Sequence, residues 1–231
     1  MKHLIETIDS SSLPIVEYDR LILNSTTNDV LVRGGVNTEY VDLGLSVKGA
    51  KCNVGAESET DAGLYFAWGE TTGYTASQVG TDKQFSWSDY KYGNSSSNLT
   101  KYNQSDGKTV LESTDDAARV IMGGDWRMPT QTEIQELLKN TNKEWTQVNG
   151  VNSYKFTSNK EGYQNNSIFI PAAGGCNDGS VYSVGYSGRV WSSSLSTSGP
   201  NSAWYLYFNS GNCRMSNGSR YNGQSVRGVR K

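Results

Sequence analysis

The feature that most constrains how this chain can fold is a hexamer near its end, Ala-Trp-Tyr-Leu-Tyr-Phe. Successive side chains of a β-strand point to opposite faces of the sheet. Trp204, Leu206 and Phe208 are therefore predicted to share one face. Tyr205 and Tyr207 then point the other way. One face of such a strand can pack into a core while the other is displayed, an arrangement more typical of a binding protein than of an enzyme.

Composition supports a loop-rich domain. The chain has 231 residues, which is enough for one large domain or for one domain with a small appendage. Only 35% of the residues are hydrophobic, but six Trp and fourteen Tyr can each bury a large area. The 25 glycines and the many Ser and Asn residues indicate turns rather than long helices. A loop-rich β or α+β domain is the favoured class.

The charge balance argues against nucleic-acid and membrane partners. The formal net charge is −2, so no general basic field would attract anionic polymers or lipids. The C-terminal arginines are interpreted as local surface chemistry: Arg214, Arg220, Arg227 and Arg230. No segment approaches the ~20 apolar residues of a membrane helix. The first residues form no apolar leader, so synthesis and folding in a cytoplasm are expected.

Two regions are predicted. Residues 1–36 contain short apolar runs at 13–16, 21–23 and 30–32, which predict two or three short strands. Fewer than about 40 residues rarely hold a core alone. This segment is therefore expected to mediate attachment or oligomerisation, with the main domain over residues 37–231.

In the main domain, strands are predicted over residues 40–47 and 64–69. Residues 71–109 have few aliphatic side chains and are interpreted as a long loop anchored by Phe85, Trp87 and Tyr90. After Trp145 the pattern predicts only strands and turns.

Two helices are predicted between these regions. The first follows Ser113 and Thr114, whose hydroxyls can cap it, places Asp115 and Asp116 in its first turn, and stops at Gly123. The second starts with a capping box from Thr130 to Glu133. Its predicted buried stripe consists of Ile134, Leu137 and Leu138.

Patterns of known catalytic and metal sites are missing from the sequence. The single histidine, His3, leaves no Ser/His/Asp or Cys/His arrangement and no His-based zinc site. Three widely spaced cysteines, Cys52, Cys176 and Cys213, are interpreted as free thiols. The carboxylates of Glu57, Glu59 and Asp61 are interpreted as a solvated loop, and Asp115–Asp116 as helix-start charge. No enzymatic activity, metal or cofactor is predicted.

Four phrases in order carry a family resemblance. They are Tyr-Val-Asp-Leu-Gly-Leu-Ser-Val at 40–47, Ala-Trp-Gly-Glu at 67–70, Trp-Arg-Met-Pro-Thr at 126–130 and Ala-Trp-Tyr-Leu-Tyr-Phe at 203–208. Over residues 38–229 the chain resembles C-type lectin-fold domains of gut Bacteroidetes, related to the Fibrobacter succinogenes major paralogous domain-like family. The resemblance implies an α+β, C-type lectin-like fold with two helices, short antiparallel strands, long loops and a small N-terminal β segment. The triplets that bind calcium and sugar in true C-type lectins are missing.

A narrower resemblance is to the variable proteins of diversity-generating retroelements of the Bacteroidetes and Bacteroides phage type, in which adenines of a C-terminal repeat are rewritten. The hexamer at 203–208 and Ser225-Val226-Arg227 match its framework, although Cys213 stands where Val is common and Gly228 where Pro is usual. The implied variable region is about 185–226, with Gln224 and Met215 left out because Asn codons cannot yield them. The implied ligand-binding residues are Arg189, Asn201, Ser202, Tyr205, Tyr207, Asn209, Asn212, Arg214, Ser216, Gly218, Ser219, Tyr221 and Asn222.

The resemblance implies a rigid platform with Trp191, Trp204, Leu206, Phe208 and Val226 as its scaffold. Its expected role is a phage tail receptor-binding protein that contacts a host cell-surface protein or glycan. Residues 1–36 would then provide virion attachment or a homo-oligomer such as a trimer. Three alternatives stay open: an undiversified relative, a bacterial surface adhesin of the same fold, and an oxidase like the formylglycine-generating enzymes, whose active cysteine pair has no matching motif here.

Overall fold

The computed structural model describes residues 21–23, 30–32 and 36–231, with the exception of residue 198. The chain divides into two compact units, Met1–Val36 and Asn37–Lys231. In the first unit, strands β1 (Leu21–Leu23) and β2 (Val30–Val32) pair in antiparallel fashion. The predicted strand at 13–16 lies outside the described residues.

The prediction of an α+β, C-type lectin-like fold is wrong. The described residues are mostly β, with 38% in strands and 9% in helices, and the strands are distributed over several small sheets. The helices are α2 (Ala117–Met122) and α3 (Gln131–Lys139), with a 3-10 turn η1 at Ala76–Gln78. The shared phrases are compatible with local turns and packing, but they do not encode which strands pair.

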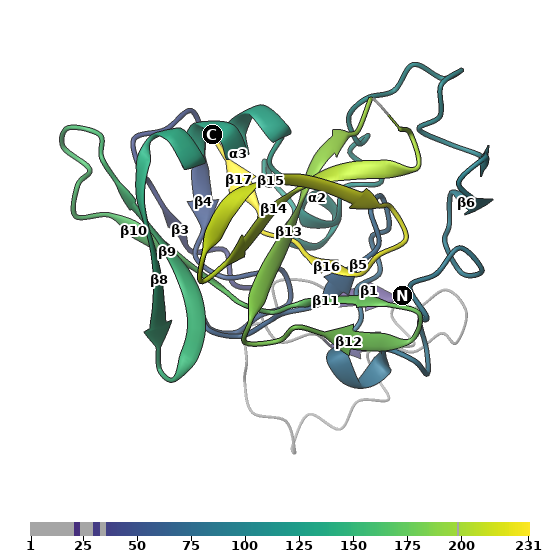
Figure 1. The fold of residues 1–231 in the computed structure, drawn as a ribbon, viewed down its shortest axis with the longest axis horizontal. Coiled ribbons are helices and arrows are strands. Elements are labelled where there is room, and N and C mark those ends of the chain that lie inside the picture. Colours follow the sequence, from purple (N-terminus) through teal and green to yellow (C-terminus); the bar gives the residue numbers. More distant parts are fainter. Residues whose placement is uncertain (1–20, 24–29, 33–35, 198) are drawn as a thin grey trace, which may run out of the picture. The chain divides into compact units, whose positions relative to one another are not determined.

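A five-stranded sheet lies at the centre of the second unit, in the order β15-β14-β13-β16-β5 (Figure 1). Its strands are β5 (Tyr65–Phe66), β13 (Ser187–Leu195), β14 (Ser202–Asn209), β15 (Asn212–Ser219) and β16 (Gln224–Ser225). The β13–β14–β15 meander is antiparallel, and β16 pairs with β13 in parallel. The C-terminal block therefore builds most of this sheet.

Helix α3 covers one face of the meander and contacts β13, β14 and β15. Ile134 of α3 packs in a buried cluster with Val190, Leu206 and Phe208, and Tyr154 also belongs to this cluster. Leu137 and Leu138 of the predicted stripe are only partly buried. Apolar residues on this face remove a large area from water, which holds the strands in register.

A second sheet, β10-β9-β8, follows α3 directly. Its strands are β8 (Thr141–Val148), β9 (Val151–Ser158) and β10 (Ser167–Pro171). Asn149 and Gly150 join β8 to β9 with φ of 50° and 80°, the left-handed values that a two-residue type I′ hairpin requires. Strands β11 (Gly175–Asn177) and β12 (Ser180–Tyr182) form a further hairpin.

The two ends of the second unit meet in a three-stranded sheet, β17-β4-β3. Its strands are β3 (Tyr40–Val41), β4 (Lys48–Ala50) and β17 (Val229–Arg230). The predicted strand over 40–47 is shorter, because the Asp42 carboxylate accepts a hydrogen bond from the Gly44 amide (2.8 Å) and the chain turns at Gly44 (φ 69°). The strand predicted over 64–69 likewise shortens to β5, ahead of a turn at Gly69 (φ 84°).

Both helices occur, but their first residues differ from prediction. Helix α2 is capped by Asp116, whose side chain accepts from the Arg119 amide, rather than by Ser113 or Thr114. Asp115 lies outside the helix and is buried against other groups. The capping box of Thr130 and Glu133 on α3 is confirmed.

The loop over residues 71–109 is anchored by buried aromatic and charged side chains. Phe85 and Tyr90 are buried as predicted, whereas Trp87 is half-buried. Lys83 forms a buried ion pair with Glu70 (2.9 Å). Two short strands, β6 (Gly93–Ser95) and β7 (Asn98–Leu99), pair inside this loop, and an isolated bridge joins Val79 to Lys83.

Candidate functional site

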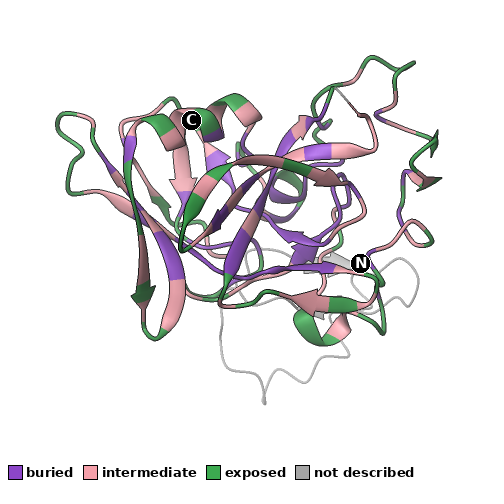
Figure 2. Cartoon of the chain, viewed as in Figure 1, coloured by how far each residue is buried: buried purple, intermediate pink, exposed green. Residues whose placement is uncertain are grey.

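The face of β13–β14–β15 opposite α3 carries most of the predicted site residues, and we name it the display face. Strand register brings Arg189, Tyr207 and Arg214 side by side across the three strands, and Tyr205 opposite Ser216. Strand β15 has no buried residue, while β13, on the other side of β14 in the same sheet, is largely buried (Figure 2). The display-face residues of the predicted set are Arg189, Tyr205, Tyr207, Asn209, Asn212, Arg214, Ser216 and Gly218.

Two arginines flank one tyrosine on this face. The guanidinium carbons of Arg189 and Arg214 lie 5.2 and 5.4 Å from the ring centroid of Tyr207. Arg189 also lies 4.9 Å from the ring centroid of Tyr182, on β12, and donates to the Ser187 hydroxyl (2.9 Å). Such cation–π contacts hold guanidinium groups in place at an exposed surface without neutralising their charge.

Tyr205 forms a second part of the display face. Its half-buried ring packs edge-on against the fully buried Trp191, with 5.6 Å between centroids. A Cβ atom added at Gly218 would lie 3.2 Å from the Tyr205 ring and 3.8 Å from Nδ2 of Asn222. Tyr205, Gly218 and Asn222 therefore lie together, and a small residue at 218 leaves room for the ring.

Two asparagines at the tip of the β14–β15 hairpin differ in whether their side chains are free to contact a ligand. The Asn209 carboxamide donates to the Tyr207 hydroxyl (2.9 Å), and its oxygen accepts from the amides of Gly211 and Asn212. Asn209 thus stabilises the turn, whereas the Asn212 side chain is exposed at the tip.

Of the five remaining predicted residues, Asn222 adjoins the display face at Gly218, and the others lie elsewhere. Ser202 and Ser219 pair with each other on the opposite face of the sheet, and Asn201 lies in the turn before β14. Tyr221 packs edge-on against Trp87 at a centroid distance of 4.9 Å. The structure therefore brings eight of the thirteen predicted residues together on one face of the sheet. Tyr221 and Asn222 follow directly after β15.

Sequence reasoning missed Tyr182 and Trp87 as neighbours of the site. Tyr182 is half-buried, and burial raises the pKa of its hydroxyl although the nearby Arg189 charge opposes this. The turn at Asp178 and Gly179, with φ of 45° and 72°, signals the hairpin that carries Tyr182, because Asp-Gly favours type I′ turns.

Two amide oxygens near the display face lack hydrogen-bond partners among the described residues, Asn222 Oδ1 and Gln224 Oε1. Gln224 is 1% exposed and precedes Ser225, which pairs with Val190. Side-chain alternation therefore places Gln224 on the side of the sheet that holds Arg189 and Trp191. Buried unpaired acceptors are rare and call for an explanation.

The interpretation of all C-terminal arginines as surface chemistry is wrong for two of them. Arg220 is fully buried and donates to the carbonyls of Lys101, Tyr102 and Pro200 and to the Tyr90 hydroxyl. Arg227 is also buried, donates to Asn53 and to carbonyls including that of Phe169, and burial lowers its pKa to about 10. Both arginines tie the C-terminal strands to loops that come much earlier in the chain.

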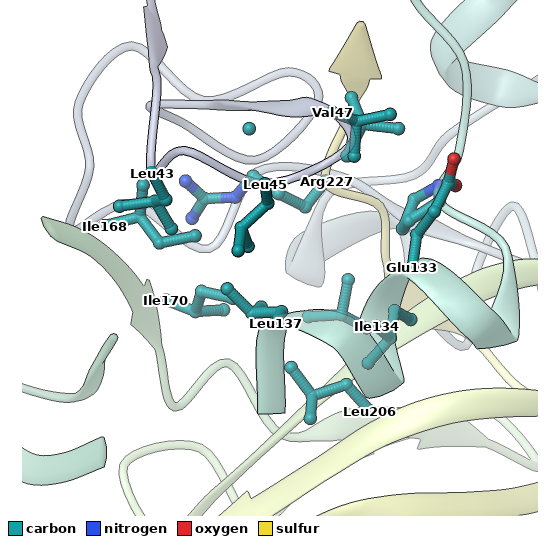
Figure 3. A pocket seen from close by; sticks show the side chains of 14 residues that line it. Leu43, Leu45, Val47, Glu133, Ile134, Leu137, Ile168, Ile170, Leu206 and Arg227 are labelled. Atoms are coloured by element: carbon teal, nitrogen blue, oxygen red, sulfur yellow. The ribbon is translucent and has the colours of Figure 1, made fainter. Parts of the chain in front are cut away.

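An apolar cavity of about 50 Å³ lies on the α3 side of the sheet rather than at the display face. Side chains from the 43–47 loop, β10 and α3 point toward one another around it (Figure 3). Its lining includes Leu43, Ile134, Ile170 and Leu206, which belong to the buried core cluster. A space of this size and lining is a packing defect of the core, too small for a drug-sized ligand.

The three cysteine thiols are not activated as nucleophiles. Cys52, Cys176 and Cys213 are free, and burial raises the pKa of Cys176 and of Cys213 to about 12. Burial also raises the pKa of Cys52. Because the thiolate is the nucleophile, these groups are poor nucleophiles at neutral pH.

The described residues contain no group of three or more His, Cys, Asp or Glu placed to hold a metal ion. None of their helices has the length and apolarity needed to span a bilayer.

A surface built from Tyr, Arg, Asn and Ser on a rigid sheet defines a ligand-binding class of protein. The sequence profile of the Lcl C-terminal domain family matches residues 59–230, and the chain belongs to that family. This membership agrees with the sequence-based assignment to variable ligand-binding proteins. No curated protein matches the chain, and no solved structure matches it.

Proposed function

We propose that this protein is a non-enzymatic receptor-binding protein of a phage tail, which contacts a host cell-surface protein or glycan through its display face. The observation that carries the proposal is the register of β13–β14–β15. It places Arg189, Tyr205, Tyr207 and Arg214 on one side of a sheet whose other side is packed against α3. Tyr and Arg are the residues that dominate binding hot spots.

Diversification of this surface is part of the proposal. Met215 and Gln224, which fall outside the set that adenine rewriting of Asn codons can produce, contact the core or are buried. Exposed positions of the display face, such as Asn212 and Arg214, fall inside that set. Exchange of those side chains would leave the packed face of the sheet untouched, which is what a diversified binding surface requires.

A non-enzymatic role is supported by the state of the nucleophiles. Burial raises the pKa of the Cys176 and Cys213 thiols to about 12, and at Cys213 the nearby Lys143 charge only partly opposes this. This weighs against an oxidase of the formylglycine-generating type. Nucleic acid and membrane lipid are not proposed as partners.

For the first unit we propose attachment to the virion or to further copies of the chain, for example in a trimer. Deletion of residues 1–36 is expected to leave the melting temperature of the second unit unchanged while altering oligomeric mass, measured by light scattering. A truncated protein that is insoluble would contradict this division of roles.

Location on a virion, after synthesis in a host cytoplasm, is proposed together with the function, and a bacterial cell surface is the alternative location. The two are separated by gene neighbourhood. A reverse transcriptase, a near-repeat of the 3′ end and tail genes support the phage protein, whereas fimbrial or lipoprotein genes support an adhesin.

The test is binding of the fluorescently labelled protein to intact cells of a panel of Bacteroidetes strains. The variant Tyr205→Ala/Tyr207→Ala/Arg214→Ala is expected to lose binding at least tenfold while remaining folded. A matched control, Lys139→Gln/Lys160→Gln, changes two cationic residues away from the display face and should bind as the parent does. Undiminished binding by the triple variant would refute the proposal.

A further inference from the structure

The β11–β12 hairpin lies beside the display face and holds one of its side chains. The guanidinium carbon of Arg189 is 4.9 Å from the ring centroid of Tyr182 on β12. A Cβ atom added at Gly175 of β11 would lie 3.2 Å from Cζ of Tyr182 and 3.3 Å from Cδ of Arg189, so the ring and the arginine stem both pack against the hairpin. Tyr182 lies outside the proposed variable region, whereas Arg189 lies inside it. A fixed residue therefore supports an exchangeable one.

The tip of this hairpin is held by residues 80–90, which we name the supporting turn. The Gly179 amide at the tip donates a hydrogen bond to the Gln84 carbonyl (2.7 Å). A Cβ atom added at Gly80 would lie 2.6 Å from the Gly179 carbonyl oxygen, so the two backbones are in direct contact. The position of the hairpin is therefore set by a segment much earlier in the chain.

The supporting turn is itself fixed by buried groups. Lys83 is 5% exposed, pairs with Glu70 shortly after β5 (2.9 Å) and donates to the Asp89 carbonyl (2.6 Å). The Asp89 carboxylate accepts from the Gln84 amide (2.7 Å). Phe85 is fully buried with a φ of 53°, a left-handed conformation that a bulky residue adopts only where its surroundings impose it. The turn can therefore hold the hairpin in one place.

The supporting turn also contacts the residues that follow β15. The ring of Trp87 packs edge-on against that of Tyr221, with 4.9 Å between centroids. Gly223 exchanges two backbone hydrogen bonds with Cys176 of β11 (2.7 and 2.9 Å), which joins the same segment to the hairpin. One turn thus reaches two residues of the proposed variable region, Tyr221 directly and Arg189 through the hairpin.

From these contacts we infer that the supporting turn is a positioning element for binding, which fixes the side chains of Arg189 and Tyr221 before a ligand arrives. Tyr182 and Trp87 are its positioning residues. The inference rests on the proposed function and concerns residues outside the display face. A side chain that is ordered in advance loses less conformational freedom on binding. For one long side chain this corresponds to about a two- to tenfold change in affinity.

Side-chain NMR of the free protein tests the positioning without any ligand. The Nε–Hε groups of Arg189 and Arg214 report the picosecond-to-nanosecond mobility of each guanidinium group. Tyr182→Leu should lower the order parameter of Arg189 and leave that of Arg214 unchanged, because the contacts of Arg214 are with Tyr207 and Met215. Tyr182→Phe keeps the ring and should leave both order parameters unchanged.

Gly80→Ala tests the supporting turn at a distance from Arg189. The added Cβ would press on the Gly179 carbonyl and displace the hairpin tip, so Arg189 should become more mobile although none of its own contacts has been substituted. The matched control is Gly107→Ala in the same loop, where φ is also left-handed (66° against 88° at Gly80) and an added Cβ would meet nothing within 4 Å. Amide spectra show whether both variants remain folded. Equal order of Arg189 in the two folded variants overturns the inference.

Cell binding separates this inference from the proposed function. Tyr182→Leu and Trp87→Ala should each weaken binding by about two- to tenfold, while Tyr182→Phe and Trp87→Phe should bind as the parent does. If the parent binds cells and both of the weakened variants bind equally well, the positioning role falls and the binding face stands. If the parent binds no strain of the panel, the proposed function falls, and the mobility of Arg189 alone decides whether the turn fixes it.

Discussion

The two faces of the β13–β14–β15 meander are made by alternate residues of the same strands, yet they differ in almost every property. Leu206 and Phe208 of β14 are buried against α3. Tyr205 and Tyr207, which alternate with them, are half-buried and contact Trp191 and two arginines. The difference shows that neighbouring residues of one strand can have separate roles, one in stability and the next in recognition. A side chain can be exchanged on one face while its neighbours hold the fold.

The largest effect is expected on the α3 face. Phe208→Ala removes a fully buried ring that lies 5.4 Å from the Tyr154 ring, and should cost about 3–5 kcal/mol of unfolding free energy. For a unit of this size the melting temperature should fall by roughly 10 °C. Calorimetry measures this change. A fall of less than about 3 °C would contradict the claim that the α3 face, and not the display face, stabilises the fold.

Arg220→Gln is expected to cost about 3 kcal/mol, because several buried carbonyl groups lose their donor. Amides in the 71–109 loop should also exchange hydrogen faster, since Arg220 ties this loop to the end of β15. The matched control is Arg214→Gln on the display face, whose exposed side chain should change stability by less than about 0.5 kcal/mol. Equal losses in the two variants would show that Arg220 has no special anchoring role.

Asp115 gives a pH-dependent comparison. Burial alone would raise its pKa, but hydrogen bonds from Lys101, Tyr102 and Tyr92 lower it to about 2. A depressed carboxyl pKa stabilises the fold above the unfolded pKa of about 4 and loses this contribution as the pH falls through about 2.

Asp115→Asn should therefore cost about 2 kcal/mol at pH 7, and the difference from the parent should shrink between pH 4 and pH 2. Urea unfolding at several pH values measures it. Asp82→Asn, at an exposed position, serves as the control. A difference that is constant over this range would mean that Asp115 acts through shape rather than charge.

The smallest effect on stability is expected on the display face itself. Tyr205→Ala removes a half-buried ring and its edge contact with Trp191, at a cost of about 1 kcal/mol. Cell binding should nevertheless fall at least tenfold. A stability loss as large as that of Phe208→Ala would make Tyr205 a core residue.

Some of this architecture is readable from the sequence because it is locally encoded. The capping box at Thr130 and Glu133 and the alternation around Leu206 depend only on neighbouring residues, and both occur. The Asn149–Gly150 and Asp178–Gly179 turns are equally local, and they would have located the β8–β9 and β11–β12 hairpins.

Other features depend on residues that are distant in the chain. The acceptors of Arg220 come from Lys101, Tyr102 and Pro200, so its burial cannot be inferred from the sequence around it. The sheet order β15-β14-β13-β16-β5 is likewise a long-range property, which explains why a set of family phrases led to the wrong fold class. Side-chain alternation assigns faces, but it does not reveal that Trp191 is covered or that Arg189 meets Tyr182.

The most direct test of the central claim compares the two faces in one experiment. Six single alanine variants, at Val190, Leu206 and Phe208 on one face and at Arg189, Tyr207 and Arg214 on the other, are measured for melting temperature and for cell binding per folded molecule. Our account predicts two separate groups: the first three lose stability and keep binding, and the last three lose binding and keep stability. A set in which binding loss follows stability loss regardless of face would contradict it.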